Sequence, residues 1–250
     1  MPDALTAALA TNGLIYIALT YLVAGVVRGF TGFGTALIVV PVAGIFLSPA
    51  EIILMIGVTG ILSNILLFPE AWGKADRGEV GITALAACIG VPIGVALLGR
   101  VDPLAVRWVV AVAAFCTLVA VISGWQWRGR LAVPGLTGIG LSAGVLGGMT
   151  ALSGPILIIF YLANARKPEA VRANMILFLG SLDVLLIANI WIAGTATWKI
   201  IWVGLIVSVP YLFSIRLGQA LFDPARETAY RAAAYAVVAG ALLTGLPLWE

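Results

Sequence analysis

The sequence has few charged residues and no histidine. Only 10% of its 250 residues are Asp, Glu, Lys or Arg, whereas a soluble domain carries about 25%. Side chains of this composition must face lipid or one another, which excludes an ordinary soluble globular domain. The two cysteines, Cys88 and Cys116, lie in separate apolar segments without CxxC spacing, which predicts small buried side chains and not a redox or metal pair.

The residue types and motifs that the sequence lacks also restrict its chemistry. The chain has no histidine, no paired-carboxylate motif, no paired-cysteine motif and no Walker loop, and hydrolytic or metal chemistry usually needs one of these. We therefore expect no metal and no cofactor. The net charge of +3 is small and scattered, which indicates membrane orientation and not nucleic-acid binding. The N-terminus, MPDALTAALATNG, has neither the basic start nor the cleavage site of a signal peptide.

Apolar residues fill most of the chain. The sequence is 62% hydrophobic with 29 glycines, and its mean hydropathy is +1.12. Small residues let transmembrane helices approach closely. We predict an all-α polytopic membrane protein that forms a single domain over residues 1–250. Its apolar stretches cover residues 14–47, 52–69, 80–99, 105–124, 133–163, 173–193, 198–221 and 229–248.

Two of these stretches, 14–47 and 133–163, exceed the roughly 20 residues that one crossing needs. Glycines interrupt both, at RGFTGFGTA (28–36) and GGMTALSGP (147–155). Irregular backbone at membrane depth must be buried in protein or line a watery cavity. We predict hairpins or helix pairs with arms of about 15 residues, or roughly 22 Å, whose tips end inside the membrane. A continuous crossing is the alternative.

The two interrupted stretches are related by a shift of 119 residues. The shift predicts two repeats of four to five helical segments each, over about 14–125 and 133–250. It pairs Leu22, Ala24, Gly25, Gly29 and Thr31 with Leu141, Ala143, Gly144, Gly148 and Thr150, Pro49 with Pro168, and Gly99 with Gly218. After a two-residue slip, Asp102-Pro103 matches Asp223-Pro224.

The distribution of Lys and Arg predicts the topology, because basic loop residues prefer the cytoplasm. If each long stretch returns to its own side, one face collects ten basic residues and the other three; simple crossings give eight and five. The first arrangement places both termini outside the cytoplasm and makes the repeats inverted, as in many secondary transporters. We expect a multi-pass protein of the cell membrane, in bacteria the inner membrane. The ten are Lys74, Arg77, Arg128, Arg130, Arg166, Lys167, Arg172, Arg216, Arg226 and Arg231; the three are Arg100, Arg107 and Lys199.

The hairpin tips have the chemistry of an anion site. A helix that begins at each tip presents free N–H groups and the positive end of its dipole, and glycines let backbone approach a ligand closely. Glycines that only permit tight helix crossing are the alternative interpretation. The predicted substrate-binding residues are Arg28, Gly29, Thr31, Gly32, Phe33, Gly34, Thr35, Asn64, Thr150, Ser153, Gly154 and Asn174.

Two charges lie deep inside apolar stretches, and an intramembrane ionisable residue suggests function. Arg28 at the first break is a candidate ligand or gate, or a structural cation for helix C-terminal carbonyls. Asp183 is a candidate carrier of a coupling proton, or the counter-ion of Arg28. The shift pairs Asp183 with Asn64, and Asn64 and Asn174 are pocket donors or interhelical contacts. Glu51, Glu70, Asp76, Glu79 and Asp102 fall at membrane edges, where we expect solvated or helix-capping roles.

The segments GVVRGFTGFGTALIVVP (25–41) and GVLGGMTALSGP (144–155) resemble the two glycine-rich signatures of the TauE/SafE sulfite exporter family. The resemblance covers essentially the whole chain, including RANMILF (172–178). It implies a permease of small sulfur-containing anions such as sulfite, sulfonates or sulfoacetate. The family's glycine triplet appears here as Gly32-Phe33-Gly34, and the second signature carries Ala151-Leu152-Ser153, so the pocket can be shaped for another anion than sulfite.

Sequence and resemblance together predict a secondary transporter of a small anion, working by alternating access with its site between the two breaks. An anion channel on the same scaffold is the alternative, and an intramembrane enzyme is a weaker one. A transporter gives saturable, coupled flux, whereas a channel gives single-channel currents. The expected partners are the anionic substrate and the lipid bilayer. A homo-oligomer is compatible with the sequence, because lipid-facing and partner-facing apolar surfaces look alike.

Overall fold

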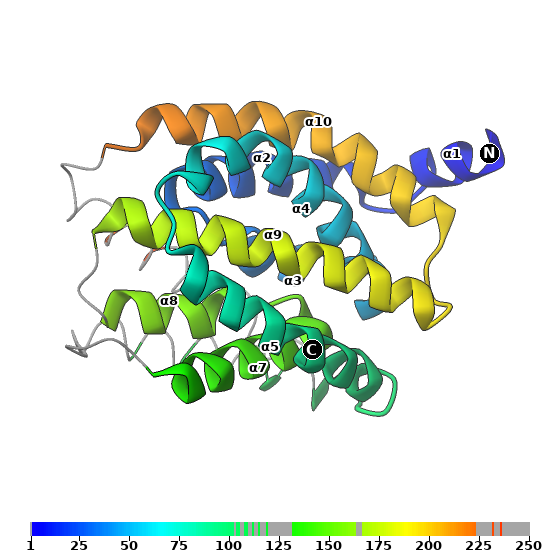
Figure 1. Ribbon diagram of the computed structural model, residues 1–250. Helices are drawn as coiled ribbons and strands as arrows, with labels where there is room; N and C mark the ends of the chain where they lie inside the picture. The colour runs from blue at the N-terminus through cyan, green and yellow to red at the C-terminus, as the bar shows by residue number, and fades with distance from the viewer. Residues whose placement is uncertain are drawn as a thin grey trace.

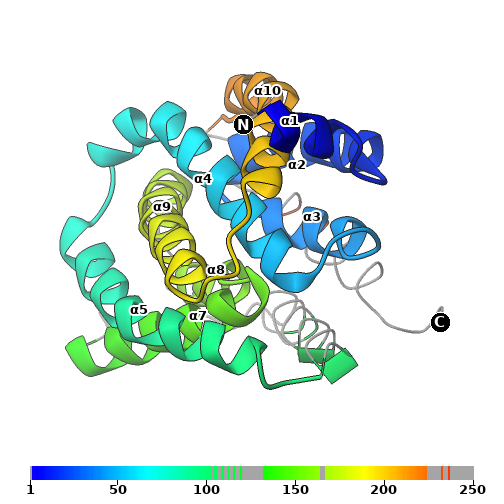
Figure 2. The same cartoon turned by 90° about the vertical axis from the view of Figure 1, so that its right-hand side faces the viewer.

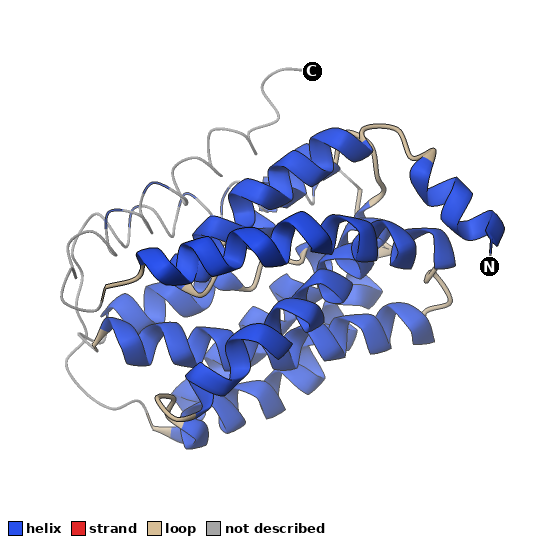
Figure 3. Cartoon of the chain, turned by 90° about the horizontal axis from the view of Figure 1, so that it is seen from above, coloured by secondary structure: helices blue, strands red, loops and turns tan. Residues whose placement is uncertain are grey.

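The described part of the chain is helical throughout. The computed structural model describes residues 2–102, 132–163 and 167–223, together with residues 104, 105, 108, 109, 112, 115, 119, 232 and 236. The helices are α1 (Pro2–Leu9), α2 (Leu14–Thr31), α3 (Thr35–Ala43), α4 (Pro49–Trp72), α5 (Arg77–Leu98), α7 (Val133–Thr150), α8 (Gly154–Ala163), α9 (Pro168–Ile192) and α10 (Trp198–Leu221). No strand occurs among these residues (Figure 3), so the all-α prediction is confirmed. The predicted stretches 105–124 and 229–248 fall largely outside them.

Six of the helices are long and apolar enough to cross a membrane: α2, α4, α5, α7, α9 and α10. Their outer faces carry large apolar side chains, such as Ile192 and Val209, which are 83% and 72% exposed. A continuous surface of this kind is unfavourable in water and suits contact with lipid. The prediction of a multi-pass membrane protein is confirmed. Cys88 also lies exposed on the bundle, which corrects its predicted burial; Cys116 lies outside the described residues.

Short polar segments and prolines begin several of the helices. Before α4, the Ser48 N–H donates to Glu51 Oε2 at 2.8 Å, and Pro49 occupies the first turn, where no N–H is needed. Before α5, Asp76 accepts a bond from the Glu79 N–H at 3.2 Å. Glu51 and Asp76 therefore act as predicted, in helix capping. The Glu79 side chain differs from the prediction, because it is only 8% exposed.

Close glycine contacts fix the direction of two helix pairs. In α2 and α10, Gly25 faces Ser214 and Gly29 faces Gly218, so these helices run parallel. A Cβ on Gly29 would overlap the Ile215 carbonyl, which shows how closely the backbones approach.

The helices α5 and α7 form a second pair of the same kind. Gly90 faces Gly144 and Gly94 faces Gly148, so α5 and α7 also run parallel, at similarly close range. Figure 2 shows the two pairs on opposite sides of the bundle, with α4 and α9 between them.

The central helices α4 and α9 run antiparallel. Gly60 of α4 lies against Asp183, and Gly180 of α9 lies against Asn64, with a Cβ at Gly180 only 2.9 Å from the amide carbon. The helices therefore cross where Asn64 meets Asp183, a pair that lies within the central turns of both helices.

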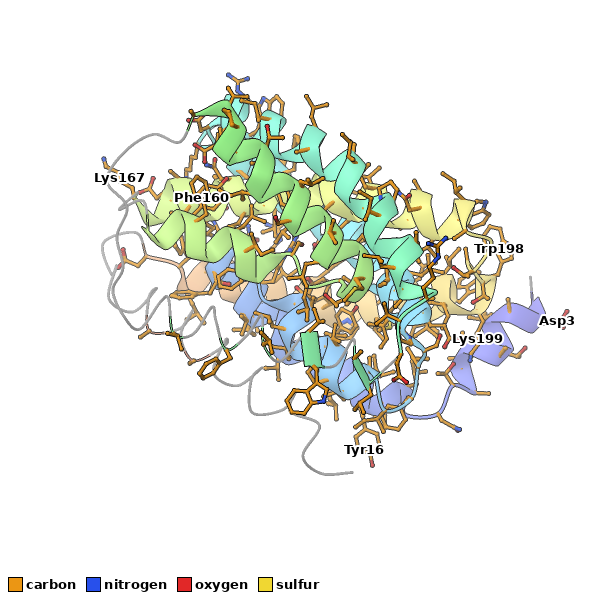
Figure 4. The ribbon with its side chains drawn as sticks, turned by 90° about the horizontal axis from the view of Figure 1, so that it is seen from below. Asp3, Tyr16, Phe160, Lys167, Trp198 and Lys199 are labelled. Carbon is orange, nitrogen blue, oxygen red and sulfur yellow. The ribbon has the colours of Figure 1, made fainter. Side chains whose placement is uncertain are left out.

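The bundle has two ends that differ in charge. The end of α4, the start of α9, the end of α2 and the end of α10 meet, because Arg172 bonds Glu70 and Gly29, and Gln219 bonds Glu70. We call this the basic end, since the described basic residues Lys74, Arg77, Lys167, Arg172 and Arg216 lie there. The opposite end carries Arg100 and Lys199. Figure 4 shows Lys167 at one end, with Trp198, Lys199 and Asp3 at the other.

Each interrupted stretch returns to the end from which it starts. Both α2 and α4 start at the opposite end, so α3 brings the chain back between them. Both α7 and α9 start at the basic end, so α8 returns the chain in the other direction (Figure 1). The two breaks therefore enter the bundle from opposite ends.

The arms of these helix pairs are unequal, which corrects the predicted lengths of about 15 residues. The first arms α2 and α7 have 18 residues each, whereas α3 has 9 and α8 has 10. At helical rise, 18 residues span roughly 27 Å, close to the thickness of the hydrocarbon core of about 30 Å. Each break therefore lies beyond the middle of the bundle.

Candidate functional site

The first break is a three-residue turn that joins α2 to α3. Gly32 ends α2 in the left-handed conformation with φ 83°, and its N–H donates to the Arg28 carbonyl at 2.8 Å. The Thr31 Oγ1 accepts a bond from the Phe33 N–H at 3.3 Å. Gly34 is also left-handed, with φ 98°, and starts α3 without a side-chain cap. The first-turn amides of α3 therefore have no acceptor within the helix or from a capping side chain.

The second break repeats most of this geometry. Ala151 ends α7 with φ 62°, and its N–H donates to the Gly147 carbonyl at 2.7 Å. The Thr150 Oγ1 accepts a bond from the Leu152 N–H at 3.1 Å. Among the described residues other than glycine, Ala151 alone has a positive φ. Ser153, at the position that corresponds to Gly34, is therefore not left-handed, and the two tips differ there.

The two breaks meet in one cavity of about 30 Å³. Its walls come from both breaks, from α4 and α9, and from Tyr211 of α10. The lining is mostly apolar with a few polar groups, as in small-molecule sites generally. The lining residues are Arg28, Gly34, Thr35, Ala36, Leu37, Ile56, Gly60, Ala151, Leu152, Ser153, Gly154, Leu179, Leu182, Asp183, Leu186 and Tyr211.

Arg28 and Asp183 both line this cavity, and the Asn64 amide connects them. The Arg28 Nη2 donates to Asn64 Oδ1 at 3.3 Å, and the Asn64 Nδ2 donates to Asp183 Oδ2 at 3.0 Å. Arg28 is 5% exposed and Asp183 6%. A buried charge is stabilised only when it is paired and hydrogen-bonded. The bridge gives each of these buried charges a hydrogen-bonded partner.

Two polar atoms of residues that line the cavity have no hydrogen-bond partner within the protein. They are Arg28 Nε, from the last turn of α2, and Ser153 Oγ, from the second break. Both side chains are more than nine-tenths buried. Buried polar groups are nearly always hydrogen-bonded, and an unsatisfied one requires an explanation such as a ligand or water. One of these donors lies in the last turn of α2 and the other in the second break, and contact of either with a substrate stays a prediction.

Tyr211 is a cavity residue that the sequence reasoning missed. Its hydroxyl lies 2.7 Å from the Thr35 Oγ1, and the residue is fully buried. The signal available in the sequence was a tyrosine in the middle of an apolar stretch, away from the interfaces that this residue prefers. Together with Thr35, Tyr211 adds hydroxyl groups to the first-break side of the cavity.

The other predicted site residues lie behind the cavity wall. Gly29 contacts α10, and its carbonyl accepts bonds from Arg172. Asn174 accepts a bond from the Asp76 N–H at 2.8 Å and so holds the start of α5. Contact of these residues with a substrate stays a prediction. The predicted residues that line the cavity are Arg28, Gly34, Thr35, Ser153, Gly154 and Asp183; those that do not are Gly29, Thr31, Gly32, Phe33, Asn64, Thr150 and Asn174.

A comparison with protein-family models gives one match. The model described as "Sulfite exporter TauE/SafE" matches residues 17–245, which include both breaks, the Asn64–Asp183 pair and every cavity residue. No curated protein and no solved structure matches the chain.

Proposed function

The chain belongs to the TauE/SafE sulfite exporter family, and from that premise we propose that it carries a small sulfur oxyanion or sulfonate across the membrane by alternating access. The family consists of transporters of sulfur anions and not of enzymes, so the enzyme alternative is withdrawn. The proposed site is the cavity between the two breaks. Its main support is the pair of unpartnered buried donors, Arg28 Nε in the last turn of α2 and Ser153 Oγ in the second break.

The donor set suits an oxyanion. A guanidinium offers several N–H groups in a fixed fork that matches sulfonate or carboxylate oxygens, and Thr35, Tyr211 and Ser153 add hydroxyls. The first-turn amides of α3 supply further donors at the positive end of a helix dipole. Low dielectric in a buried cavity strengthens each of these interactions.

The cavity is small. Its volume of about 30 Å³ holds about two water molecules, at roughly 10–15 Å³ each. A sulfur oxyanion therefore requires the walls to separate. We interpret this conformation as one in which the site has contracted between the two open states.

An inverted duplication would give both open states from one fold. The 119-residue offset carries Leu14–Thr31 onto Val133–Thr150, and Asn64 onto its own contact partner Asp183. A residue that contacts its own counterpart in the other repeat is expected to lie on the pseudo-two-fold axis that relates the repeats. Toward their ends the halves differ. Gly218 faces Val26 and Phe30. The corresponding residues of the second repeat, Val145 and Met149, face Gly94 and not Gly99, the residue that the offset pairs with Gly218.

The decisive experiment is a thermal-stability titration of the purified protein, because a ligand that binds only the folded state raises its apparent stability. The ligands are sulfite, sulfoacetate, other sulfonates, thiosulfate and simple carboxylates. We expect a sulfur anion to stabilise the protein, and Arg28→Ala to weaken its binding about 10- to 100-fold, the loss of a charged hydrogen bond. Arg100→Ala removes the same charge from an exposed site and should bind normally. If Arg28→Ala binds the anion with wild-type affinity, Arg28 does not contact the substrate.

Asp183 has two possible roles in this mechanism, and the same preparation separates them. As a carrier of a coupling proton, it would make liposome flux depend on pH, and Asp183→Asn would abolish that dependence. As a fixed partner of the Arg28–Asn64 bridge, it would instead be required for folding or binding at every pH. Arg28 and Tyr211 are the other ionisable groups that line the cavity, so Tyr211→Phe serves as the matched control. Flux with the wild-type pH profile in Asp183→Asn would exclude the proton-carrier role.

A further inference from the structure

Arg172 of α9 covers the first break on the side of the basic end. Its Nε and Nη2 donate to the Gly29 carbonyl at 3.2 and 2.9 Å, near the C-terminal end of α2. A cation in this position interacts favourably with the helix dipole. A Cβ on Gly32 would lie 2.9 Å from Arg172 Cγ, so the side chain packs directly on the break. Arg172 is only 4% exposed, although the sequence indicates an ordinary basic residue at a membrane edge.

Glu70 fixes this arginine and ties further helix ends to it. The Arg172 Nη1 donates to Glu70 Oε1 at 2.9 Å, and the Gln219 Nε2 donates to Glu70 Oε2 at 3.3 Å. The guanidinium carbon also lies 4.6 Å from the centre of the Phe222 ring. The ends of α2, α4 and α10 and the start of α9 are thus held together by one cluster, and all three guanidinium nitrogens of Arg172 take part.

The opposite end has no equivalent cluster at the corresponding positions. The 119-residue offset pairs Arg172 with Ile53, an apolar residue that is 1% exposed. It pairs Glu70 with Asn189, whose amide donates only to the Leu185 carbonyl of its own helix. At these positions the basic end has charge-assisted hydrogen bonds, whereas the corresponding Ile53 and Asn189 carry no charge.

We propose that Arg172 and Glu70 form a gate that closes the cavity toward the basic end. Opening at this end requires the Arg172–Glu70 ion pair and the bonds from Arg172 to the Gly29 carbonyl to separate. Charge-assisted bonds of this kind are stronger than neutral ones, so the gate favours the state that is closed at the basic end. The inference rests on the proposed function, in that the gate controls access to the same cavity.

The test measures access to the cavity without any substrate. Ala36 lines the cavity, and Ala36→Cys in a background with Cys88→Ala and Cys116→Ala provides a single thiol. A membrane-impermeant maleimide is applied to right-side-out and to inside-out vesicles. Glu70→Gln removes one charge of the gate, and losing about 1.5 kcal/mol from the closed state raises the open population about tenfold. We expect a roughly tenfold faster reaction, only from the face that exposes Lys167.

Two further variants make the outcome specific. Arg172→Lys keeps the charge but loses the planar fork that reaches Glu70 and Gly29 together, so it should accelerate labelling from the same face. Lys74→Ala removes the exposed second partner of Glu70, 3.4 Å away with 45% of its side chain exposed. A surface ion pair contributes little, so labelling should not change.

The gate is excluded if both Glu70→Gln and Arg172→Lys label at the parent rate, or if labelling rises only from the opposite face. An equal rise in Lys74→Ala would also exclude it, because net charge would then explain the effect. If one gate variant fails to fold, the other decides. The labelling needs no anion, so a failed anion titration with accelerated labelling would contradict the proposed substrate and leave the gate standing.

Discussion

At the scale of single residues, Ala151 occupies a backbone position that suits glycine. Its φ of 62° ends α7, where Gly32 ends α2 with φ 83°. A left-handed conformation costs an L-residue roughly 1–2 kcal/mol, while glycine loses about 0.5–1 kcal/mol of chain entropy on folding. We expect Ala151→Gly to stabilise the protein by about 0.5 kcal/mol or more. The measurement is the apparent melting temperature in detergent.

Gly32→Ala is the reciprocal change and should act in the opposite sense. An alanine there would adopt the unfavourable conformation and would also press on the Arg172 Cγ and carbonyl oxygen, 2.9 and 3.0 Å from the new Cβ. We expect a loss of about 2 kcal/mol or more. If Ala151→Gly lowered the melting temperature as Gly32→Ala does, the second break would not have the conformation described.

The sequence identified the residues whose chemistry conflicts with their surroundings. Arg28 and Asp183 were found because a charge inside an apolar stretch is visible without a structure, and both line the cavity. Arg172 was placed among the basic residues of one membrane face, although its side chain is buried under α2. Its role depends on a contact with Glu70, 102 residues away, and a charge near a helix start gives no indication of such a contact.

At the scale of helices, the glycine-rich segments located both breaks but not the lengths of their arms. The breaks fall at residues 32–34 and 151–153, inside the predicted segments 28–36 and 147–155. Equal arms were expected because apolar composition continues to residue 47. The chain leaves the helix after Ala43, where a turn leads to the Ser48 cap of α4, and hydropathy does not distinguish an apolar turn from an apolar helix.

The close packing of α7 on α5 gives a prediction at the same scale. A Cβ on Gly148 would overlap the Val91 carbonyl and lie 3.0 Å from the Val95 nitrogen. These are backbone atoms and cannot rotate away, so Gly148→Ala should cost about 1–3 kcal/mol by overpacking. Gly138→Ala in the same helix meets no atom within 4 Å and should gain up to about 1 kcal/mol of helix propensity. Thermal unfolding of the two variants compares them.

Equal stability of the two variants would mean that α5 and α7 are not in direct backbone contact. This contact matters for the whole fold. The α5–α7 and α2–α10 contacts each join the first helix of one proposed repeat to a helix of the other repeat. Each half of the protein is then completed by the other, and neither is expected to fold alone.

At the scale of the whole molecule, the positions of a few charges predicted which helix ends lie together. The described members of the predicted cytoplasmic set, from Lys74 to Arg216, lie at the basic end, and Arg100 and Lys199 lie at the other. The positive-inside rule could be applied because the two breaks indicated where the chain turns back. The cluster around Arg172 and the unequal arms could not be predicted, since both depend on how helices distant in sequence pack.

This arrangement predicts the orientation of the protein in its membrane. Basic residues are retained on the cytoplasmic side, so the basic end should face the cytoplasm and α1 the opposite compartment. Lys167→Cys and Thr197→Cys place single exposed thiols at the two ends, in a background with Cys88→Ala and Cys116→Ala. An impermeant maleimide should label the thiol at position 197 in intact spheroplasts and the thiol at 167 only in inverted vesicles.

The reverse labelling pattern would show that the protein is inserted the other way, and labelling of both thiols from one side would contradict the helix directions themselves. The predicted pattern also places the Arg172–Glu70 gate on the cytoplasmic face. A resting state closed there keeps the cavity inaccessible to cytoplasmic anions until the cluster separates. The orientation therefore determines which compartment's anions the closed gate excludes.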